Sequence, residues 1–283
     1  MIAVEKYFHK LSLCIIVLFF ISGQCYAKTK EEWVKQCMDE TLTGDLKTAT
    51  AACNQALVID PDYVEALFWR GTALAHQNNC SYAIKDFSRV LVQQPNDVEA
   101  LNNRAVCYRD LKHYELALND INAALYIDAK YMEAYMTRAG IYNQQNNFEE
   151  AIANYNHAIE IAPNNSAAVH NRGVMFYKLK NFKNANRDFT KALELNPEYF
   201  DALINRAMLH REQEQYQNAI FDFTKALDIK PRNADAILER AKCYILLQNY
   251  PLAITDLRAF IDVAPPTHSM RQEVLEILSQ INR

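Results

Sequence analysis

The sequence has little glycine and none of the short motifs that mark common catalytic and nucleotide-binding sites. Only 5 of its 283 residues are glycine, whereas 50% are hydrophobic. The patterns H-E-x-x-H, C-x-x-C, G-x-x-x-x-G-K-[ST], G-x-G-x-x-G and G-x-S-x-G do not occur. The scarcity of glycine suits a chain that is nearly all helix. The absence of the motifs predicts a protein that is not an enzyme and binds no cofactor.

A clustered basic surface is also missing. The formal net charge is −4, and acidic and basic residues are interspersed along the chain. Because contact with phosphates needs a clustered basic face, we expect no nucleic-acid partner. The histidines show no metal-ligand spacing, so we expect no metal site either.

No apolar run is long enough to cross a membrane. The run Leu11–Ser22 is well short of the ~20 residues that a spanning helix needs. It follows Lys6 and Lys10 and precedes the small residues at Cys25–Ala27, which is the pattern of a secretory signal peptide. We therefore predict that residues 1–27 are a signal peptide and that the protein is exported to the periplasm. Secretion, or tethering to the membrane by an uncleaved signal, are the alternatives.

What the sequence does contain is a pattern that returns every 34 residues. One copy is Ser166–Tyr199, in which small, aromatic and proline residues stand at fixed places. An alanine column runs through all copies: Ala49, Ala83, Ala117, Ala151, Ala185, Ala219 and Ala253. A fixed period of this length indicates a stack of identical supersecondary units rather than one globular core.

Each copy is predicted to be a pair of helices, because its apolar residues recur at spacings of three and four. Within Ser166–Tyr199 we expect one helix over 166–178 and a second over 182–195, with Pro197 ending the second. Ala129 replaces this proline in the third copy, so we expect the preceding helix to run past the usual end. Seven copies tile residues 30–267.

The repeat resembles the tetratricopeptide repeat (TPR), whose signature includes A-x3-F and an early tryptophan within 34 residues. Ala185-x3-Phe189 matches this signature, and Trp33 stands in the tryptophan position of the first repeat. The resemblance implies an all-α solenoid of about seven helix-turn-helix repeats, wound as a right-handed superhelix. We expect a signal peptide (1–27), a divergent N-terminal repeat or cap (28–63), six regular repeats (64–267) and a C-terminal capping helix (268–283).

One column of the repeat is arginine, and another is acidic. The arginines are Arg70, Arg104, Arg138, Arg172, Arg206 and Arg240. The acidic residues are Asp86, Asp120, Asp188, Asp222 and Asp256, with Asn154 in the remaining place. The arginines could form a ladder for anionic ligands, or each could pair with the aspartate of the second helix. The matched acidic column favours structural pairing.

The resemblance also implies a concave groove lined by the first helix of each repeat, which holds an extended or helical segment of a partner protein. The groove residues are Phe68, Asn102, Val106, Met136, His170, Val174, Ile204, Met208 and Leu238. The alternative is that these side chains pack against adjacent helices. The positions that would hold lysines in a chaperone-binding TPR are not lysine here, so we expect a neutral-to-basic, partly apolar partner segment.

Two cysteines of the first repeat lie in columns that face each other. Cys37 and Cys53 are 16 residues apart on its two helices, and in an exported chain this arrangement predicts a disulfide. Two small core residues are the alternative. The other cysteines that follow the signal peptide, and His210 in a column of Tyr and Phe, are typical of core residues.

These features together predict an exported scaffold that binds a protein partner and has no small-molecule substrate. Assembly of the cell envelope is the setting that we expect. The alternative function is a lumenal or secreted co-chaperone that holds unfolded polypeptides. Self-association through the ends of the solenoid is a further possibility.

Overall fold

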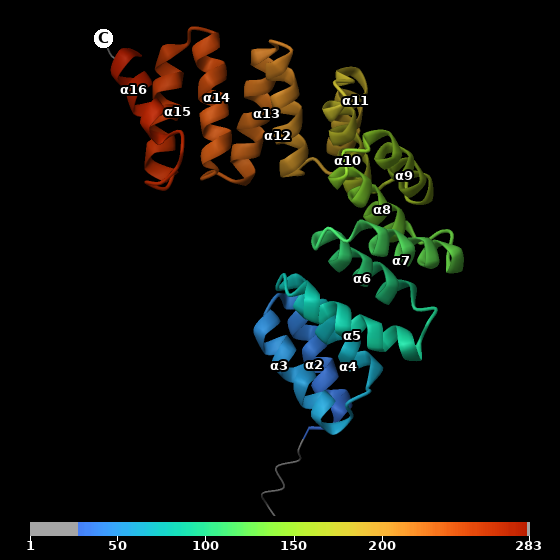
Figure 1. The fold of residues 1–283 in the computed structure, drawn as a ribbon. Coiled ribbons are helices and arrows are strands. Elements are labelled where there is room, and N and C mark those ends of the chain that lie inside the picture. Colours follow the sequence, from blue (N-terminus) through green and yellow to red (C-terminus); the bar gives the residue numbers. More distant parts are fainter. Residues whose placement is uncertain (1–27, 282–283) are drawn as a thin grey trace, which may run out of the picture. The chain divides into compact units, whose positions relative to one another are not determined.

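The structure is a computed structural model that describes residues 28–281 (Figure 1). The predicted signal peptide lies outside the described residues. Within residues 28–281 the chain forms 15 helices and no strand. No helix in this range is long and apolar enough to cross a membrane. The helices divide into two compact units, one ending at Cys107 and the other beginning at Tyr108.

The N-terminal unit is a stack of helices that pair in chain order, with α2 against α3, α3 against α4 and α4 against α5. Its helices are α2 (Lys30–Thr43), α3 (Leu46–Ile59), α4 (Val64–His76), α5 (Cys80–Gln93) and the larger part of α6 (Val98–Asp110). In Figure 1 these are the blue, teal and first green ribbons. The last helix of the unit crosses its boundary, because Cys107 lies within α6.

The C-terminal unit continues the same alternation from α7 to α16 (green to red in Figure 1). The first helices of its repeats are α8 (Met132–Gln144), α10 (Ser166–Lys178), α12 (Phe200–Glu212) and α14 (Ala234–Leu246). The second helices are α7 (Tyr114–Ile127), α9 (Phe148–Ile161), α11 (Phe182–Leu195), α13 (Tyr216–Ile229) and α15 (Tyr250–Val263), followed by α16 (Arg271–Ile281). The bounds of α10 and α11 coincide with the two helices expected for Ser166–Tyr199. The all-helical repeat fold predicted from the sequence is therefore confirmed.

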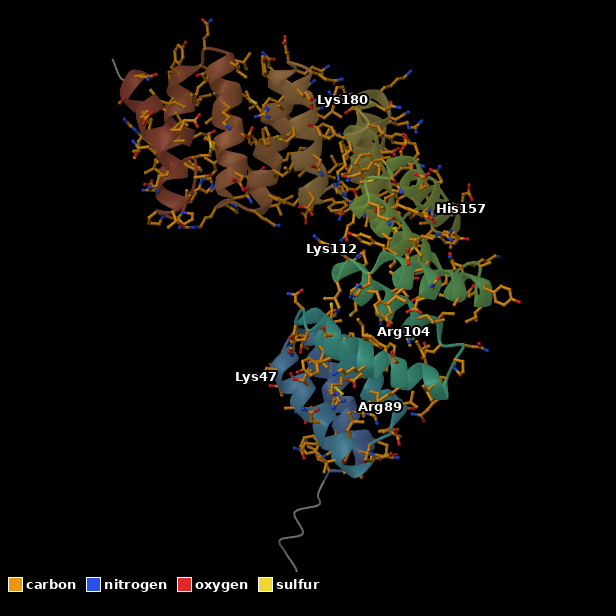
Figure 2. The ribbon with its side chains drawn as sticks, in the orientation of Figure 1. Lys47, Arg89, Arg104, Lys112, His157 and Lys180 are labelled. Atoms are coloured by element: carbon orange, nitrogen blue, oxygen red, sulfur yellow. A yellow bond between two sulfur atoms is a disulfide. The ribbon has the colours of Figure 1, made fainter. Side chains whose placement is uncertain are left out.

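The turn inside each regular repeat has one geometry throughout the chain. After α10, Lys180 adopts a positive φ of 57°, and Asn181 N–H donates to the Phe176 carbonyl at 2.8 Å. This is the hydrogen bond of a Schellman motif, which satisfies a carbonyl left open at the helix end. The residues with positive φ at the equivalent turns are Asn78, Lys112, Asn146, Glu214 and Gln248. Lys112 and Lys180 are labelled in Figure 2. None of these left-handed positions is occupied by glycine.

The end of the second helix does not depend on proline. In the third repeat α7 ends at Ile127, the same place as in the other repeats, although Ala129 stands where they have proline. The expectation that α7 would run on is therefore wrong. Asp128 takes an extended conformation, its carboxylate accepts the Lys130 N–H at 2.8 Å, and its carbonyl accepts the Tyr131 N–H at 3.1 Å. This turn ends the helix without help from a pyrrolidine ring.

Small residues allow the paired helices to approach closely. Every residue of the alanine column is fully buried. At Gly173 an added Cβ would lie 2.9 Å from Cε1 of Phe189, the large buried residue of the partner helix. Contacts of this kind explain why the column that contains Gly173 holds only glycine or alanine in the regular repeats.

The C-terminal helix starts later than expected. The sequence suggested a helix from His268, but α16 begins at Arg271. The ring Nδ1 of His268 accepts the Met270 N–H at 3.2 Å, which holds residues 268–270 in a turn before the helix. Val274 of α16 is fully buried in the cluster that also contains Phe260, so the helix covers the last repeat.

Candidate functional site: the first-helix faces and the arginine ladder

Five arginines of the column each tie a first helix to the second helix of the same repeat. In the fifth repeat, Arg172 Nε and Nη2 donate to the two carboxylate oxygens of Asp188 at 2.7 and 2.9 Å. Arg70, Arg206 and Arg240 hold Asp86, Asp222 and Asp256 in the same two-pronged way. The aspartates are buried, and a buried carboxylate requires such a partner. The hydrogen bonds that Arg240 donates to Asp256 also raise the pKa of Arg240 above its ordinary value.

The same arginines reach back to the preceding repeat. Arg172 Nη1 donates to Asn156 Oδ1 at 2.8 Å, a residue 16 positions earlier, whereas Asp188 lies 16 positions later. The six receiving residues are Asn54, Ser88, Asn122, Asn156, Thr190 and Thr224. Each of the six has a short side chain that carries an oxygen. This polar column is visible in the sequence, but the sequence analysis did not predict its bonds with the arginines. Five of these arginines, Arg70, Arg138, Arg172, Arg206 and Arg240, donate to a second helix on each side. Each of the five thus fastens three helices, and little of its guanidinium is left to bind a ligand.

Arg138 differs from the arginines that hold aspartates. Its Nε donates to Asn154 Oδ1 at 2.6 Å, and its Nη1 donates to Asn122 Oδ1 at 3.0 Å. Within the part of the chain that the structure describes, no carboxylate pairs with this guanidinium. The amide nitrogen of Asn154 instead donates to the Glu150 carbonyl at 2.8 Å. The guanidinium therefore keeps an uncompensated charge.

The predicted groove residues divide into two groups by exposure. Three are buried, with 7% of Asn102, 6% of His170 and 3% of Leu238 exposed. The other six are half-buried: Phe68, Val106, Met136, Val174, Ile204 and Met208. The three buried residues have little surface for contact with a partner. Their burial agrees with the alternative that these side chains pack against adjacent helices. The half-buried six retain both packing contacts and accessible surface.

In the C-terminal unit we call the surface formed by Met136, Val174, Ile204 and Met208 the A-face. Met136 and Val174, on α8 and α10, pack against one buried cluster that includes Tyr155. Ile204 and Met208, both on α12, pack against another, which includes Leu238. The A-face thus consists of partly exposed apolar side chains, each of which packs on a buried cluster.

His170 is not available for binding, because hydrogen bonds hold its ring. Asn205 Nδ2 donates to Nε2 at 2.8 Å, and Nδ1 lies 3.1 Å from Asn171 Oδ1 and 3.3 Å from the Tyr199 hydroxyl. The ring also packs against Phe189 and Tyr199, with centroids 5.7 and 4.8 Å apart. This network assigns the proton to Nδ1 and a neutral imidazole to the site. Burial lowers the pKa of His170 below its ordinary value of 6.5.

Hydrogen bonds between successive first helices join residues 35 positions apart. Asn205 and His170 form one such pair. The others are Tyr177 with Glu212, whose oxygens lie 2.6 Å apart, and Lys178 with Asn143, at 2.8 Å. Burial, followed by the contact with Glu212, raises the pKa of Tyr177 to about 12. The sequence analysis missed these pairs, although a search for polar residues at a spacing of 35 would have found them.

An ionic cluster lies on α12 and α14 beside the A-face. Glu239 accepts from Arg211 and, at 2.9 Å, from Lys242. Burial and then the positive charge of Arg211 lower the pKa of Lys242. Two cations therefore share one carboxylate at this end of the unit, which the sequence did not lead us to expect.

In the N-terminal unit the groove residues lie on α4 and α6. Phe68 packs edge-on against Trp69 and Phe87, with centroids 5.6 and 6.0 Å apart. Asn102 is buried on α6, and its Oδ1 has no hydrogen-bond partner among the described residues. Val106, one turn further along α6, is half-buried.

Cys37 and Cys53 lie opposite each other in the first repeat. The structure joins their sulfur atoms as a disulfide between α2 and α3, with Cα atoms 5.4 Å apart. Both residues are fully buried. The remaining cysteines of the described chain, Cys80, Cys107 and Cys243, are buried and form no disulfide.

No cluster of histidine, cysteine and acidic residues suited to a metal ion occurs within residues 28–281. His210 Nδ1 lies 2.8 Å from Gln215 Oε1, and its Nε2 lies 3.9 Å from Asp222 Oδ2. Its ring therefore has neighbours of its own in the core, and the described residues show no other potential ligand beside it.

Comparison with known protein families identifies the repeat. Profiles described as TPR repeat or tetratricopeptide repeat match residues 77–131, 139–180, 166–199, 200–233 and 235–267. The chain belongs to the tetratricopeptide repeat family. Proteins of this family typically serve as scaffolds that bind other proteins. No curated protein matches the chain.

Several solved structures share the fold. A tetratricopeptide repeat protein from Parabacteroides merdae is 21% identical, with 90% of this chain and 99% of that chain covered and a TM-score of 0.62. YrrB, described as a TPR protein with an unusual peptide-binding site, is 22% identical over 68% of this chain and 97% of its own, with a TM-score of 0.55. PilF of Pseudomonas aeruginosa is 19% identical over 77% and 97%, with a TM-score of 0.65. At these identities the likeness shows the fold alone.

Proposed function

We propose that the protein is an exported scaffold whose A-face binds an extended or helical segment of a partner protein, in assembly of the cell envelope. The observation that carries this proposal is the row of half-buried apolar side chains on α8, α10 and α12, which includes two methionines. Methionine adapts its shape to different apolar partners. The peptide-binding site named for YrrB is consistent with this use of the fold.

Charge near the A-face specifies the partner further. The exposed acidic residues Glu133, Asp201 and Asp235 lie in the first turns of α8, α12 and α14. These carboxylates repel an acidic segment and favour a neutral or basic one. We therefore propose that the partner segment is partly apolar and carries lysine or arginine.

Site-specific photo-crosslinking in living cells tests the scaffold. A photoreactive residue would replace Met136 or Met208, and the exposed Lys183 on α11 would carry the same probe as a control. We expect one protein to be captured from both A-face positions and not from Lys183, with capture weakened by Asp201→Lys. Capture of many unrelated proteins would instead indicate a co-chaperone, and capture from Lys183 alone would assign binding to the other face.

Export is tested separately. The proposal requires the protein to be found in the periplasmic fraction with Lys28 as its first residue, which N-terminal sequencing would establish. A full-length chain recovered from the cytoplasm would contradict export, while leaving the binding role of the A-face open to its own test.

A further inference from the structure

A hollow of about 490 Å³ lies in the N-terminal unit, between α3, α4 and α5. Its lining residues are Thr50, Asn54, Arg70, Leu74, Tyr82, Lys85, Asp86 and Arg89. The volume falls in the range of about 300–1,000 Å³ that is typical of sites for small organic ligands. Neither the scaffold function nor the arginine ladder accounts for an open space here.

Two side chains that line the hollow are smaller than their counterparts in most other repeats. Leu74 stands in a column where the seventh repeat has Tyr244, and Thr50 stands in a column where the sixth has Ile220. Shorter side chains in both columns leave unfilled volume between the helices. The hollow therefore depends on the small side chains at these two positions.

The cations at the hollow differ in how many hydrogen bonds they already make within the protein. Arg70 is fully engaged by Asp86 and Asn54. Arg89 uses its Nη2 on the Pro61 carbonyl and on Asp62, whereas its other nitrogens have no acceptor in the described chain.

Lys85 is the least engaged of the three cations. Its Nζ lies 5.1 Å from the centroid of the Tyr82 ring and has no acidic partner within residues 28–281. The Tyr82 side chain is itself 63% exposed. The hollow thus presents an available ammonium beside an aromatic ring.

Charge and polarity together define what the hollow would accept. Three cations and one carboxylate line the hollow, and Asp62 offsets part of the charge of Arg89. The remaining positive charge suits a ligand with one negative charge better than a ligand with two. Leu74 and the Tyr82 ring supply an apolar wall beside these charges. A ligand with one anionic end and one apolar end satisfies both parts.

We propose that this hollow binds a monocarboxylate carried on an apolar or aromatic arm. Lys85 and Arg89 bind the carboxylate, and the arm lies against Leu74 and Tyr82. The carboxylate belongs either to a free organic acid or to the C-terminal residue of a peptide, because both present the same group.

The site is separate from the predicted partner-binding groove. Arg70 lies two residues after Phe68, the groove position of α4. Two residues correspond to about 200° around a helix, so Arg70 and Phe68 lie on opposite sides of α4. Binding in the hollow therefore does not depend on the proposed scaffold function.

The test measures binding to the whole purified protein by isothermal titration calorimetry. The probes are 3-phenylpropionate, as a free acid, and the peptide acetyl-Gly-Gly-Phe, as a chain end; comparison of the two distinguishes the sources. Their amides, which lack the charge, and inorganic phosphate, which lacks the arm, serve as controls. We expect at least one carboxylate probe to bind at least tenfold more tightly than its own amide and than phosphate.

Two variants separate shape from charge. Thr50→Ile with Leu74→Tyr fills the hollow with residues that the chain uses elsewhere, and Lys85→Gln with Arg89→Gln removes the charge. Each pair should weaken binding at least tenfold, while Lys47→Gln, on the exposed side of α3, should leave it unchanged. Lys47 and Arg89 are both labelled on the N-terminal unit in Figure 2. Thermal unfolding of each variant verifies that it is folded.

Three results would overturn the proposal. They are the failure of both carboxylate probes to bind, equal binding of the amides or of phosphate, and unchanged binding when the hollow is filled. None of these results bears on the crosslinking test, because that test probes α8 and α12.

Discussion

One amide distinguishes Arg138 from the arginines that hold an aspartate. Asn154, which is 6% exposed, accepts a hydrogen bond from Arg138 with a single oxygen. In the fifth repeat, both carboxylate oxygens of Asp188 accept from the equivalent Arg172. A half-buried cation without a counter-charge is destabilised relative to a paired one. The fourth repeat should therefore be weaker at this point than its neighbours.

Asn154→Asp is expected to stabilise the protein by about 1 kcal/mol, because the new carboxylate completes a charge-assisted, two-pronged pair with Arg138. Urea unfolding followed by circular dichroism measures the shift in midpoint. The matched control is Asp188→Asn, which should cost about 2 kcal/mol by removing the equivalent pair. A lower midpoint for Asn154→Asp would show that burial of the carboxylate outweighs its pairing.

His170 is a second residue whose surroundings predict a measurable effect. The hydrogen bond from Asn205 to Nε2 requires a neutral ring, and burial lowers the pKa below 6.5. The folded state therefore binds a proton less readily than the unfolded state. The stability that this difference supplies is fully present above pH 6.5 and is lost as the pH falls through the folded pKa.

We expect His170→Gln to remove this part of the pH dependence. The wild-type protein should lose more stability between pH 7.5 and pH 5.5 than the variant does, because glutamine does not titrate. Urea unfolding at both pH values makes the comparison, with His157→Gln, at an exposed position, as the control. Identical pH dependence in wild type and His170→Gln would contradict the neutral-ring assignment.

At the scale of the helix, the turns show how a repeat is built without glycine. The residue after the C-cap of each regular first helix has positive φ, and none of the six is glycine. The left-handed conformation costs an ordinary side chain about 1–2 kcal/mol, and asparagine tolerates it better. Lysine, glutamate and glutamine in these turns thus store a small, repeated strain.

Lys180→Gly should raise the free energy of unfolding by roughly 0.5–1 kcal/mol, because relief of the strained φ exceeds the entropy that glycine adds to the unfolded chain. Lys180 is exposed and its side chain makes no hydrogen bond in the described structure, so the change tests the backbone alone. Asn146→Gly is the control, with a smaller gain. Destabilisation by Lys180→Gly would mean that the turn is not strained.

The helices of the regular repeats could be predicted from the sequence because apolar periodicity and the 34-residue period agree. α10 and α11 begin and end where expected. Two predicted helix boundaries, the end of α7 and the start of α16, differ from the structure. Ala129 does not lengthen α7, because Asp128 ends the helix by its own turn. The start of α16 depends on a hydrogen bond within residues 268–270, which no periodicity reveals.

The candidate site was less accessible to sequence analysis. Column positions indicated which residues share the first-helix faces, but not how deeply each is buried. Leu238 is covered because it joins the cluster of the last repeats and α16, and His170 is covered because the rings of Phe189 and Tyr199 pack on it. Burial depends on the size of neighbours in adjacent repeats. The identity of one residue in a column therefore does not predict how deeply that residue is buried.

At the scale of the whole molecule, the first repeat carries the only pair of cysteines that the structure joins within residues 28–281. Such a bridge reduces the conformational entropy of the unfolded chain and stabilises the repeat at the start of the described chain. The bridge in the native protein stays a prediction, and it requires an oxidising compartment such as the periplasm.

Thiol titration of the unfolded, unreduced protein lacking residues 1–27 should find three free thiols rather than five. Replacing both Cys37 and Cys53 by serine should lower the free energy of unfolding by about 3 kcal/mol, the effect of opening a loop of this size. Replacing the buried, free Cys80 by serine is the control for loss of a core residue. Five free thiols would exclude the bridge.

The bonds of the arginine ladder depend only on separation along the chain, with partners 16 residues before and 16 residues after. A tandem duplication of any 34 consecutive residues within the regular repeats, starting at any point, therefore recreates both bonds for the copied arginine. No junction needs to fall at a repeat boundary. A gene encoding this chain could gain one repeat by imprecise copying, and each copied arginine of the ladder would still have its partner positions 16 residues before and after it.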